Sequence, residues 1–531
     1  RRLVKENTMS GQFKKQLSLL DLTLIGLGSI FGSGWLFSAS HVASLAGPAG
    51  IISWLIGGFS VLLLGIIYCE LGAALPRAGG IIRYPVFSHG PMQGYLLGSI
   101  TVIAFSSLIA IEVVAAREYA AAWFPSLTTI SDGVRSPSVL GWFFQFALLC
   151  LFFALNYYSV KTFAVANNIV SVLKFTVPLL VIVALLYHFK PENFSVTSMA
   201  PTGSRGIESA VSAGGIIFAY LGLTPIISVA SEVKRPQYTI PFALILSVLL
   251  STAIYIVLQI AFLGAVPTEL VANGWQGISE HFPLPFKDIA LILGLGWLAM
   301  LVVTDAIVSP SGCGNIYMAA TPRVIYAWSN SQTFFKVFSK VDQKSGIPRP
   351  ALWLTFFLSL FWTMPFPSWE KLITIVSAAL VLSYALAPVT VGALRRNAPD
   401  LPRPFFVKGF TVLGPLAFIV ASFIVYWSGW NVISWLLGSQ LVLVALYLVF
   451  KRFVPTHEVS LKQQLKSSAW LITYYTLMII VSYLGCFGEG ASHTIPEPYD
   501  TLVVTVVALI CYYWGINTGL PKAMIKEDDE A

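Results

Sequence analysis

The chain has 531 residues, of which 56% are hydrophobic and only 11% are charged. Soluble globular proteins contain about 25% charged residues, so this composition excludes a soluble enzyme. The 32 Lys and Arg exceed the 24 Asp and Glu, giving a net charge of +8, and in so apolar a chain the excess indicates loops beside an anionic membrane leaflet, with no nucleic-acid partner. We therefore expect an all-α polytopic protein whose partner is the lipid bilayer.

A helix needs about 20 apolar residues to cross a hydrocarbon core, and the sequence contains about fourteen such runs. They lie at residues 19–46, 51–75, 92–123, 139–159, 166–189, 207–232, 240–266, 291–326, 351–366, 371–394, 411–428, 432–451, 469–487 and 500–518. The run at 291–326 is too long for a straight crossing at ~1.5 Å per residue, so we expect it to tilt, break or include an interfacial helix.

Most of the 32 Lys and Arg residues fall on the side of the predicted membrane that holds both termini. The positive-inside rule then predicts a multi-pass protein of the cell membrane with both termini in the cytosol. The predicted parts are a cytosolic N-terminal segment at 1–18, a core at 19–394 with halves 19–189 and 207–394, four accessory transmembrane helices at 411–518, and a cytosolic tail at 519–531.

Two of the predicted spans contain helix breakers at corresponding positions. The first has the sequence Gly32-Ser33-Gly34, and the sixth has Gly222 shortly before Thr224 and a proline. Non-helical backbone persists in a membrane only where it lines a cavity, and paired breaks in repeated halves mark the binding sites of many secondary transporters. Free N–H groups after the first break would face a carboxylate, and carbonyls at the second would face an ammonium. The pattern favours an amino acid ligand, with close packing of helices through small residues as the alternative.

Three segments resemble signature regions of the amino acid-polyamine-organocation (APC) transporter superfamily: 24–36 (LIGLGSIFGSGWL), 70–84 (ELGAALPRAGGIIRY) and 218–241, which contains FAYLGLTP and SEVKRP. Across nearly the whole chain the sequence is similar to bacterial L-aspartate/proton symporters of that superfamily. The resemblance implies a five-plus-five inverted-repeat (LeuT-like) core with broken helices 1 and 6. It also implies proton-coupled import of an acidic amino acid, L-aspartate first and L-glutamate second, by alternating access.

Ionisable side chains deep inside a membrane helix are costly and are therefore functional candidates. Glu112 lies near the middle of the third predicted span, and Lys174 lies roughly 10 Å inside the fifth at ~1.5 Å per residue. The resemblance implies that Lys174 takes the place of a sodium ion bound in sodium-driven relatives. We interpret Lys174 and Glu112 as candidates for proton coupling, and Glu112 also as a candidate for substrate binding. The alternatives are a fixed structural ammonium for Lys174 and a polar contact between helices for Glu112.

The candidate substrate site combines groups at the two breaks with residues of the third and eighth spans: Ile30, Gly32, Ser33, Gly34, Glu112, Phe218, Ala219, Tyr220, Gly222, Thr224, Ser311 and Asn315. The group from Gly32 to Gly34 would hold the α-carboxylate, and backbone groups of Ile30, Phe218 and Ala219 would lie near the ammonium.

Four other members of the candidate site have different expected roles. Tyr220 and Gly222 would shape the cavity, while Ser311 and Asn315 would offer hydroxyl and amide donors.

The resemblance also implies that Thr224 stands where many relatives, including arginine exchangers, have Glu. A missing carboxylate favours an acidic or neutral substrate.

The sequence lacks a phosphate-binding loop, and its 6 His and 5 Cys show no metal-ligand spacing. We therefore expect no enzyme activity, no metal, no cofactor and no obligate protein partner, with a proton gradient as the driving force. Two alternatives stay open: a sodium-independent exchanger of neutral or cationic amino acids, and a membrane amino acid receptor that does not transport.

Overall fold

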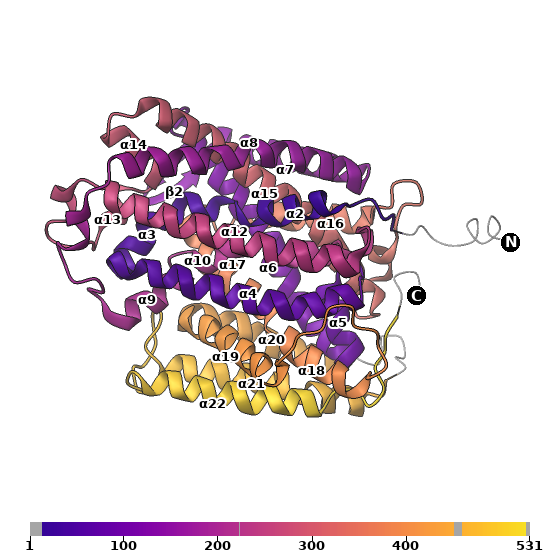
Figure 1. Cartoon of the computed structure of the whole chain (residues 1–531). Helices are drawn as coiled ribbons and strands as arrows, with labels where there is room; N and C mark the ends of the chain where they lie inside the picture. Colours follow the sequence, from indigo (N-terminus) through magenta and orange to yellow (C-terminus); the bar gives the residue numbers. More distant parts are fainter. Residues whose placement is uncertain (1–12, 222, 451–458, 527–531) are drawn as a thin grey trace.

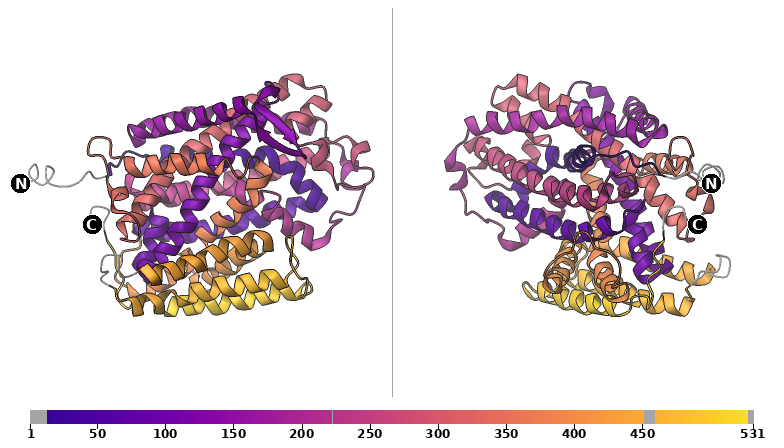
Figure 2. Two further views of the ribbon diagram at one scale, coloured as in Figure 1. Left: turned by 180° about the vertical axis from the view of Figure 1, so that it is seen from behind. Right: turned by 45° about the vertical axis from the view of Figure 1, so that its right-hand side comes forward.

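The computed structural model describes residues 13–221, 223–450 and 459–526. Long helices run between two ends of the molecule (Figure 1). The first and last described segments, 13–18 and 519–526, lie at the end that we call the terminal end. The hairpin of β1 (Thr128–Ser131) and β2 (Val134–Pro137) lies at the opposite end, which we call the distal end (Figure 2).

The first half of the predicted core forms six longer helices and one short one. Their bounds are α2 (Leu19–Ile30), α3 (Ser33–Ala46), α4 (Gly50–Ala74), α5 (Gly80–His89), α6 (Pro91–Ala120), α7 (Val139–Tyr157) and α8 (Val160–Tyr187). Short 3-10 turns occur at η1 (Gly47–Ala49), η2 (Pro125–Leu127) and η3 (Pro191–Phe194). Helix α6 is central, because 94% of its most apolar window is buried inside the protein, whereas only 28% of that of α7 is buried.

The second half of the predicted core begins with several short helices. Its elements are α9 (Gly203–Ser212), α10 (Ile216–Tyr220), α11 (Leu223–Ser228), η4 (Ala230–Glu232), α12 (Pro236–Ala265), η5 (Thr268–Val271), α13 (Ile278–His281), α14 (Pro285–Ile292), α15 (Gly296–Asn330), η6 (Lys336–Ser339), α16 (Arg349–Trp362), α17 (Trp369–Tyr384) and α18 (Ala387–Asn397). The long run predicted at 291–326 is uninterrupted from residue 296 onward, since α15 has 35 residues. At ~1.5 Å per residue it exceeds the thickness of a hydrocarbon core.

Four further helices form a separate layer beside the core (Figure 1). They are α19 (Phe410–Trp427), α20 (Trp430–Phe450), α21 (Leu461–Leu484) and α22 (Tyr499–Asn517). The assignment of residues 411–518 as an accessory segment stays a prediction. Residues 1–12 and 527–531, which belong to the predicted cytosolic segment and tail, lie outside the described residues.

By length and composition, 11 helices in the described part of the chain could cross a membrane. One of these candidates, Leu19–Ala74, covers two of the predicted spans. The predicted spans at 207–232 and 351–366 are absent from the set because the first is divided into short helices and α16 has only 14 residues.

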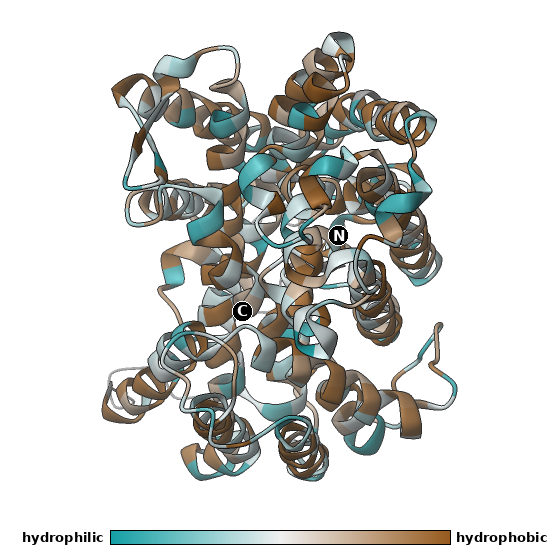
Figure 3. Ribbon diagram, turned by 90° about the vertical axis from the view of Figure 1, so that its left-hand side faces the viewer, coloured by the Kyte–Doolittle hydropathy of each residue, from teal (hydrophilic) through white to brown (hydrophobic). Residues whose placement is uncertain are grey.

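Apolar side chains cover the perimeter of the bundle as well as filling its interior. Seen along the helices, apolar residues colour the outer helices and hydrophilic residues gather in the loops (Figure 3). Val183 of α8 and Phe143 of α7 are 69% and 67% exposed. Surfaces of this kind are stable when lipid surrounds them, which supports the prediction of a membrane protein.

Candidate functional site

The first predicted span is broken as expected. Helix α2 ends at Ile30 and α3 begins at Ser33, so Phe31 and Gly32 are not helical. A Cβ atom on Gly32 would lie 2.8 Å from Oε1 of Glu112 and 3.0 Å from Cys313. Glycine has no Cβ and so avoids these close contacts. The break therefore depends on glycine because α6 and α15 approach the backbone closely at this point.

Glu112 of α6 binds the N-terminus of α3. The Ser33 backbone N–H donates to Oε2 of Glu112 at 2.8 Å, and the Ser33 hydroxyl donates to Oε1 at 3.1 Å. Both residues are fully buried. The first N–H groups of a helix lack partners within it and lie at its positive end, so a carboxylate is favourable there. The structure thus places a carboxylate of the protein on the donors that the sequence assigns to a substrate carboxylate.

The second break is more extensive than predicted. Residues 213–215 separate α9 from α10, and Leu221 follows α10; Gly222 lies outside the described residues. A Cβ on Gly34 would lie 2.7 Å from Cα of Ala219. Helices α3 and α10 therefore touch backbone to backbone, and this contact brings the two breaks together.

Tyr255 of α12 bridges the two breaks, a role that sequence reasoning missed. Its hydroxyl oxygen lies 2.7 Å from the carbonyl oxygen of Ile30 and 2.8 Å from that of Ala219. A hydroxyl has one hydrogen, so a second donor could be accommodated between these carbonyls. The carbonyl of Phe218 instead accepts the N–H of Leu221 at 3.2 Å. Of the three backbone groups predicted to lie near an ammonium, Ile30 and Ala219 converge on one point.

Lys174 of α8 lies on the α2 side of the first break. Its ammonium donates to the carbonyl of Gly28 at 2.8 Å, and the residue is completely buried. A Cβ on Gly28 would lie 3.3 Å from Nζ, and a Cβ on Gly312 would lie 3.1 Å from it. Glycines on α2 and α15 thus leave room for the ammonium. The negative end of α2, where carbonyls lack helical partners, stabilises a cation there.

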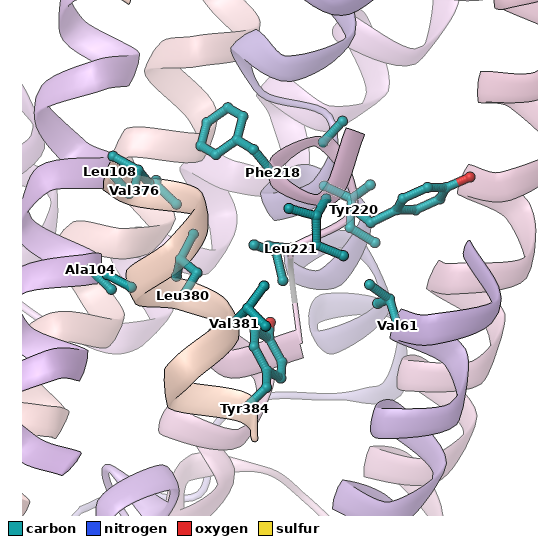
Figure 4. Close-up of a cluster of buried hydrophobic side chains, with 14 of the residues drawn as sticks. Val61, Ala104, Leu108, Phe218, Tyr220, Leu221, Val376, Leu380, Val381 and Tyr384 are labelled. Atoms are coloured by element: carbon teal, nitrogen blue, oxygen red, sulfur yellow. The ribbon is translucent and has the colours of Figure 1, made fainter. Parts of the chain in front are cut away.

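Two tyrosines bind the backbone at the second break. Tyr317 of α15 donates to the carbonyl of Leu221 at 2.9 Å, and the N–H of Thr224 donates to the hydroxyl oxygen of Tyr384 at 3.3 Å. Figure 4 shows Tyr384 at the end of α17, with Leu380 of the same helix and Phe218 of α10 in one cluster of buried side chains. The broken backbone is therefore bonded by side chains from α15 and α17.

Three predicted site residues point elsewhere. The Tyr220 hydroxyl donates to the carbonyl of Trp54 in α4 at 2.9 Å. The Ser311 hydroxyl donates to the carbonyl of Ile307 in its own helix, and the side chain of Asn315 accepts a hydrogen bond from the Asn156 side chain of α7 at 2.8 Å.

Helix geometry explains why α15 presents Cys313, and not Ser311 or Asn315, to the first break. Cys313 faces the first break, where its thiol donates to the carbonyl of Ser29 at 3.2 Å. Successive helical residues turn by about 100°, so Ser311 and Asn315, two positions either side of Cys313, point away from that break. Cys313 carries no polar signal in the sequence that would have singled it out.

A buried ion pair lies nearer the terminal end. Nε of Arg323 in α15 donates to Oε2 of Glu232 at 3.1 Å, and its Nη2 donates to Oε1 at 2.9 Å. Each side chain is only 1% exposed. A Cβ on Gly79, which follows α4, would lie 2.2 Å from the carbonyl oxygen of Arg323. This bidentate pair joins η4 to α15 and is stronger than an exposed pair because little solvent competes with it.

The fold and the site together define a class of protein. Interrupted helices, a buried carboxylate and a buried ammonium meet inside a bundle with an apolar perimeter, a combination typical of secondary transporters. A family model described as amino acid permease matches residues 17–510. The chain belongs to the amino acid permease family, and the prediction of a transporter and not an enzyme is confirmed.

Curated relatives extend over nearly the whole chain. It is 57% identical over 518 residues to the aspartate-proton symporter of Bacillus subtilis (strain 168), a match that covers 98% of this chain and 99% of the relative. It is 36% identical over 524 residues to the glutamate/serine transporter AimA of the same organism, covering 98% and 96%. It is 25% identical over 458 residues to the branched-chain amino acid permease BcaP of that organism, covering 85% and 96%.

Proposed function

We propose that this protein is a secondary active transporter that imports an acidic amino acid, L-aspartate and also L-glutamate, by proton symport through alternating access. The relative that is named an aspartate-proton symporter supports this substrate and this coupling ion. The observation that carries the proposal is the bond between Glu112 and both donors of Ser33.

The proposed coupling rests on competition between two carboxylates for one pair of donors. The N–H and O–H of Ser33 are held by Glu112, whose carboxylate lies against Gly32, so a second anion that takes these donors must lie beside it. Two carboxylates this close repel strongly in a medium of low dielectric constant. A proton on Glu112 removes its charge and weakens its hold on Ser33, and the substrate carboxylate then takes the donors. Each substrate thus enters with a proton.

The remaining groups bind the rest of the substrate. The ammonium of the amino acid binds where the carbonyls of Ile30 and Ala219 converge on Tyr255. Lys174 holds the end of α2 through Gly28 and supplies the positive charge that a bound cation would otherwise provide. It is a second group through which protonation can affect the shape of the first break.

The proposed architecture has about fourteen spans, with an inverted-repeat core at 19–394 and accessory helices at 411–518. The protein lies in the cell membrane with both termini in the cytosol, so the terminal end is the inner end and the distal end is the outer one. It needs no cofactor and no obligate protein partner, because the proton gradient supplies the energy.

The test is uptake of labelled L-aspartate into sodium-free proteoliposomes with an inward proton gradient and no internal amino acid. Accumulation that disappears when the gradient is collapsed supports proton symport. Uptake that requires amino acid inside the vesicle would instead show exchange, and binding without uptake would show a receptor.

A further inference from the structure

A cavity of about 660 Å³ lies at the distal end of the protein. Its walls come from α3, the β1–β2 hairpin, the segment around α13 and the start of α17, and its lining includes His41, Arg135, Glu280 and Lys371. The buried lining residues include two aromatic rings, those of Phe37 and Trp369, with exposures of 3% and 1%. These two rings form the part of the wall nearest to the first break, since Trp369 also contacts Ser33.

Trp369 is packed on more than one side. Its ring stacks on Phe37, with centroids 4.6 Å apart and an interplanar angle of 11°, and lies nearly parallel to His41 at 5.8 Å. It meets Phe218 of α10 edge to face at 6.3 Å. A Cβ on Gly215 would lie 3.1 Å from the far edge of the indole. The ring therefore fills the gap between α3 and α10, the two segments that adjoin the breaks.

A chain of hydrogen bonds connects this ring to the proposed substrate site. The indole N–H of Trp369 donates to the hydroxyl oxygen of Ser33 at 2.9 Å, and that hydroxyl donates to Glu112 at 3.1 Å. One hydroxyl thus accepts from α17 and donates to α6. A ligand that accepts the hydrogen bond of the Ser33 hydroxyl in place of Glu112 reorients that hydroxyl. The direction from which the Ser33 oxygen can accept the N–H of Trp369 then changes as well.

We propose that Trp369 is the gate between the distal cavity and the substrate site, held closed by its hydrogen bond to Ser33. The inference rests on the proposed function in one respect, namely that Ser33 binds the substrate carboxylate. When Glu112 releases Ser33, the hydroxyl turns toward the incoming carboxylate. After the indole has moved aside to admit the substrate, its N–H bonds to the hydroxyl again from the distal side and closes the site over the substrate. Trp369 is a positioning residue, because it acts on the substrate through Ser33.

Cys313 provides a native reporter of access to the site. Its side chain lies against Gly32 and Ser29 at the first break, and it is 1% exposed. The experiment keeps this thiol and replaces the other four cysteines, Cys69, Cys150, Cys486 and Cys511, by alanine. A small membrane-impermeant thiosulfonate is added to the distal side of reconstituted protein, and the rate of labelling is measured with and without L-aspartate.

Two variants separate the hydrogen bond from the ring. Trp369→Phe keeps a stacked ring but loses the N–H, and we expect labelling of Cys313 to accelerate about tenfold, the factor that one net hydrogen bond represents. Trp369→Ala removes the ring as well, so we expect a larger increase. The matched control is Trp353→Phe, at a position of α16 that is 48% exposed, and its rate should equal that of the parent.

The outcomes distinguish the gate from the proposed substrate. Labelling that stays unchanged, or stays absent, in both Trp369 variants would overturn the gate whether or not the protein transports aspartate. Faster labelling in the variants supports the gate, because the readout does not require transport. If labelling accelerates but L-aspartate gives no protection in the parent, the gate holds and the proposed substrate is wrong. We also expect Trp369→Phe to raise KM for uptake more than it lowers kcat.

Discussion

The two ends of the molecule are closed by different chemistry. At the terminal end, Arg323 and Glu232 form a bidentate ion pair with each side chain 1% exposed. At the distal end, the rings of Phe37 and Trp369 and one hydrogen bond to Ser33 separate a cavity of about 660 Å³ from the first break. Stacked rings can slide apart without leaving a charge unpaired. Separating a buried ion pair leaves both charges without their counterion, which costs more free energy. We therefore expect the distal barrier to open first from this state.

The ion pair at the terminal end should give the largest effect when it is broken. Arg323→Ala removes the guanidinium that binds both carboxylate oxygens of buried Glu232, and we expect a loss of about 3–5 kcal/mol in the free energy of unfolding. The melting temperature of the purified protein in detergent measures this loss. The control is Arg205→Ala, because Arg205 and Glu497 lie 3.7 Å apart with exposures of 48% and 30%, and such a pair contributes at most about 1 kcal/mol. Equal changes for the two variants would contradict the assigned importance of the buried pair.

The contact between α3 and α10 should give the next largest effect, because it holds together the elements that move at the distal end. In Gly34→Ala the added methyl would lie 2.7 Å from Cα of Ala219, and overpacking of this kind costs about 1–3 kcal/mol. We expect aspartate uptake to be lost and the melting temperature to fall. Gly438→Ala in α20 is the control, since no atom lies within 4 Å of the added Cβ. Normal uptake by Gly34→Ala would show that the two segments separate freely.

The carboxylate of Glu112, which binds Ser33, should decide whether a proton gradient can drive the accumulation of aspartate. Glu112→Gln keeps an acceptor for Ser33 but cannot carry the charge. One coupled proton supports about a tenfold accumulation for each pH unit of gradient, or about 1.4 kcal/mol, and the variant should lose this accumulation. Exchange of labelled for unlabelled L-aspartate should continue. Glu112→Gln vesicles that still concentrate aspartate when a gradient is applied would exclude Glu112 as the coupling site.

The residues of the broken elements stand out in the sequence because they are chemically unusual in a membrane. Glycine beside serine at Gly32 and Ser33 is a poor helix former, and the charges of Glu112 and Lys174 are costly in an apolar helix. Each of these signals is local, so it can be read from a short stretch of sequence. The structure brings all four residues to one break.

The partners of those residues could not be predicted, because they depend on contacts between distant helices. Aromatic residues make up 14% of the chain, so nothing local distinguishes Tyr255 or Trp369 from the others. Arg323 and Glu232 are 91 positions apart. The rotation of α15 about its axis, which turns Cys313 toward the break and Asn315 toward α7, is set by packing and not by the composition of that helix.

A loop at the terminal end should give the smallest effect and the clearest dependence on pH. Asp342 accepts the Ser345 backbone N–H at 2.8 Å and the Ser345 hydroxyl at 2.7 Å, and Arg349 lies 3.5 Å away. These donors, with the nearby guanidinium, hold the pKa of Asp342 below its ordinary value. The pKa of Asp342 is lower in the folded protein than in the unfolded chain. Ionised Asp342 therefore stabilises the fold at pH values above its ordinary pKa of about 4, and this contribution disappears as the pH falls through the folded-state pKa.

Asp342→Asn should therefore lower the melting temperature near neutral pH and have little effect near pH ~3. Ser345→Ala removes one of the two donors, so its effect should have the same sign and be smaller. A difference between Asp342→Asn and the parent that grows as the pH falls would reverse the sign and contradict the assignment. Since the loop lies next to the start of α16 and away from the gate at Trp369, labelling of Cys313 from the distal side should be the same in both variants as in the parent. That result would show that stability at the terminal end can be changed without opening the distal barrier.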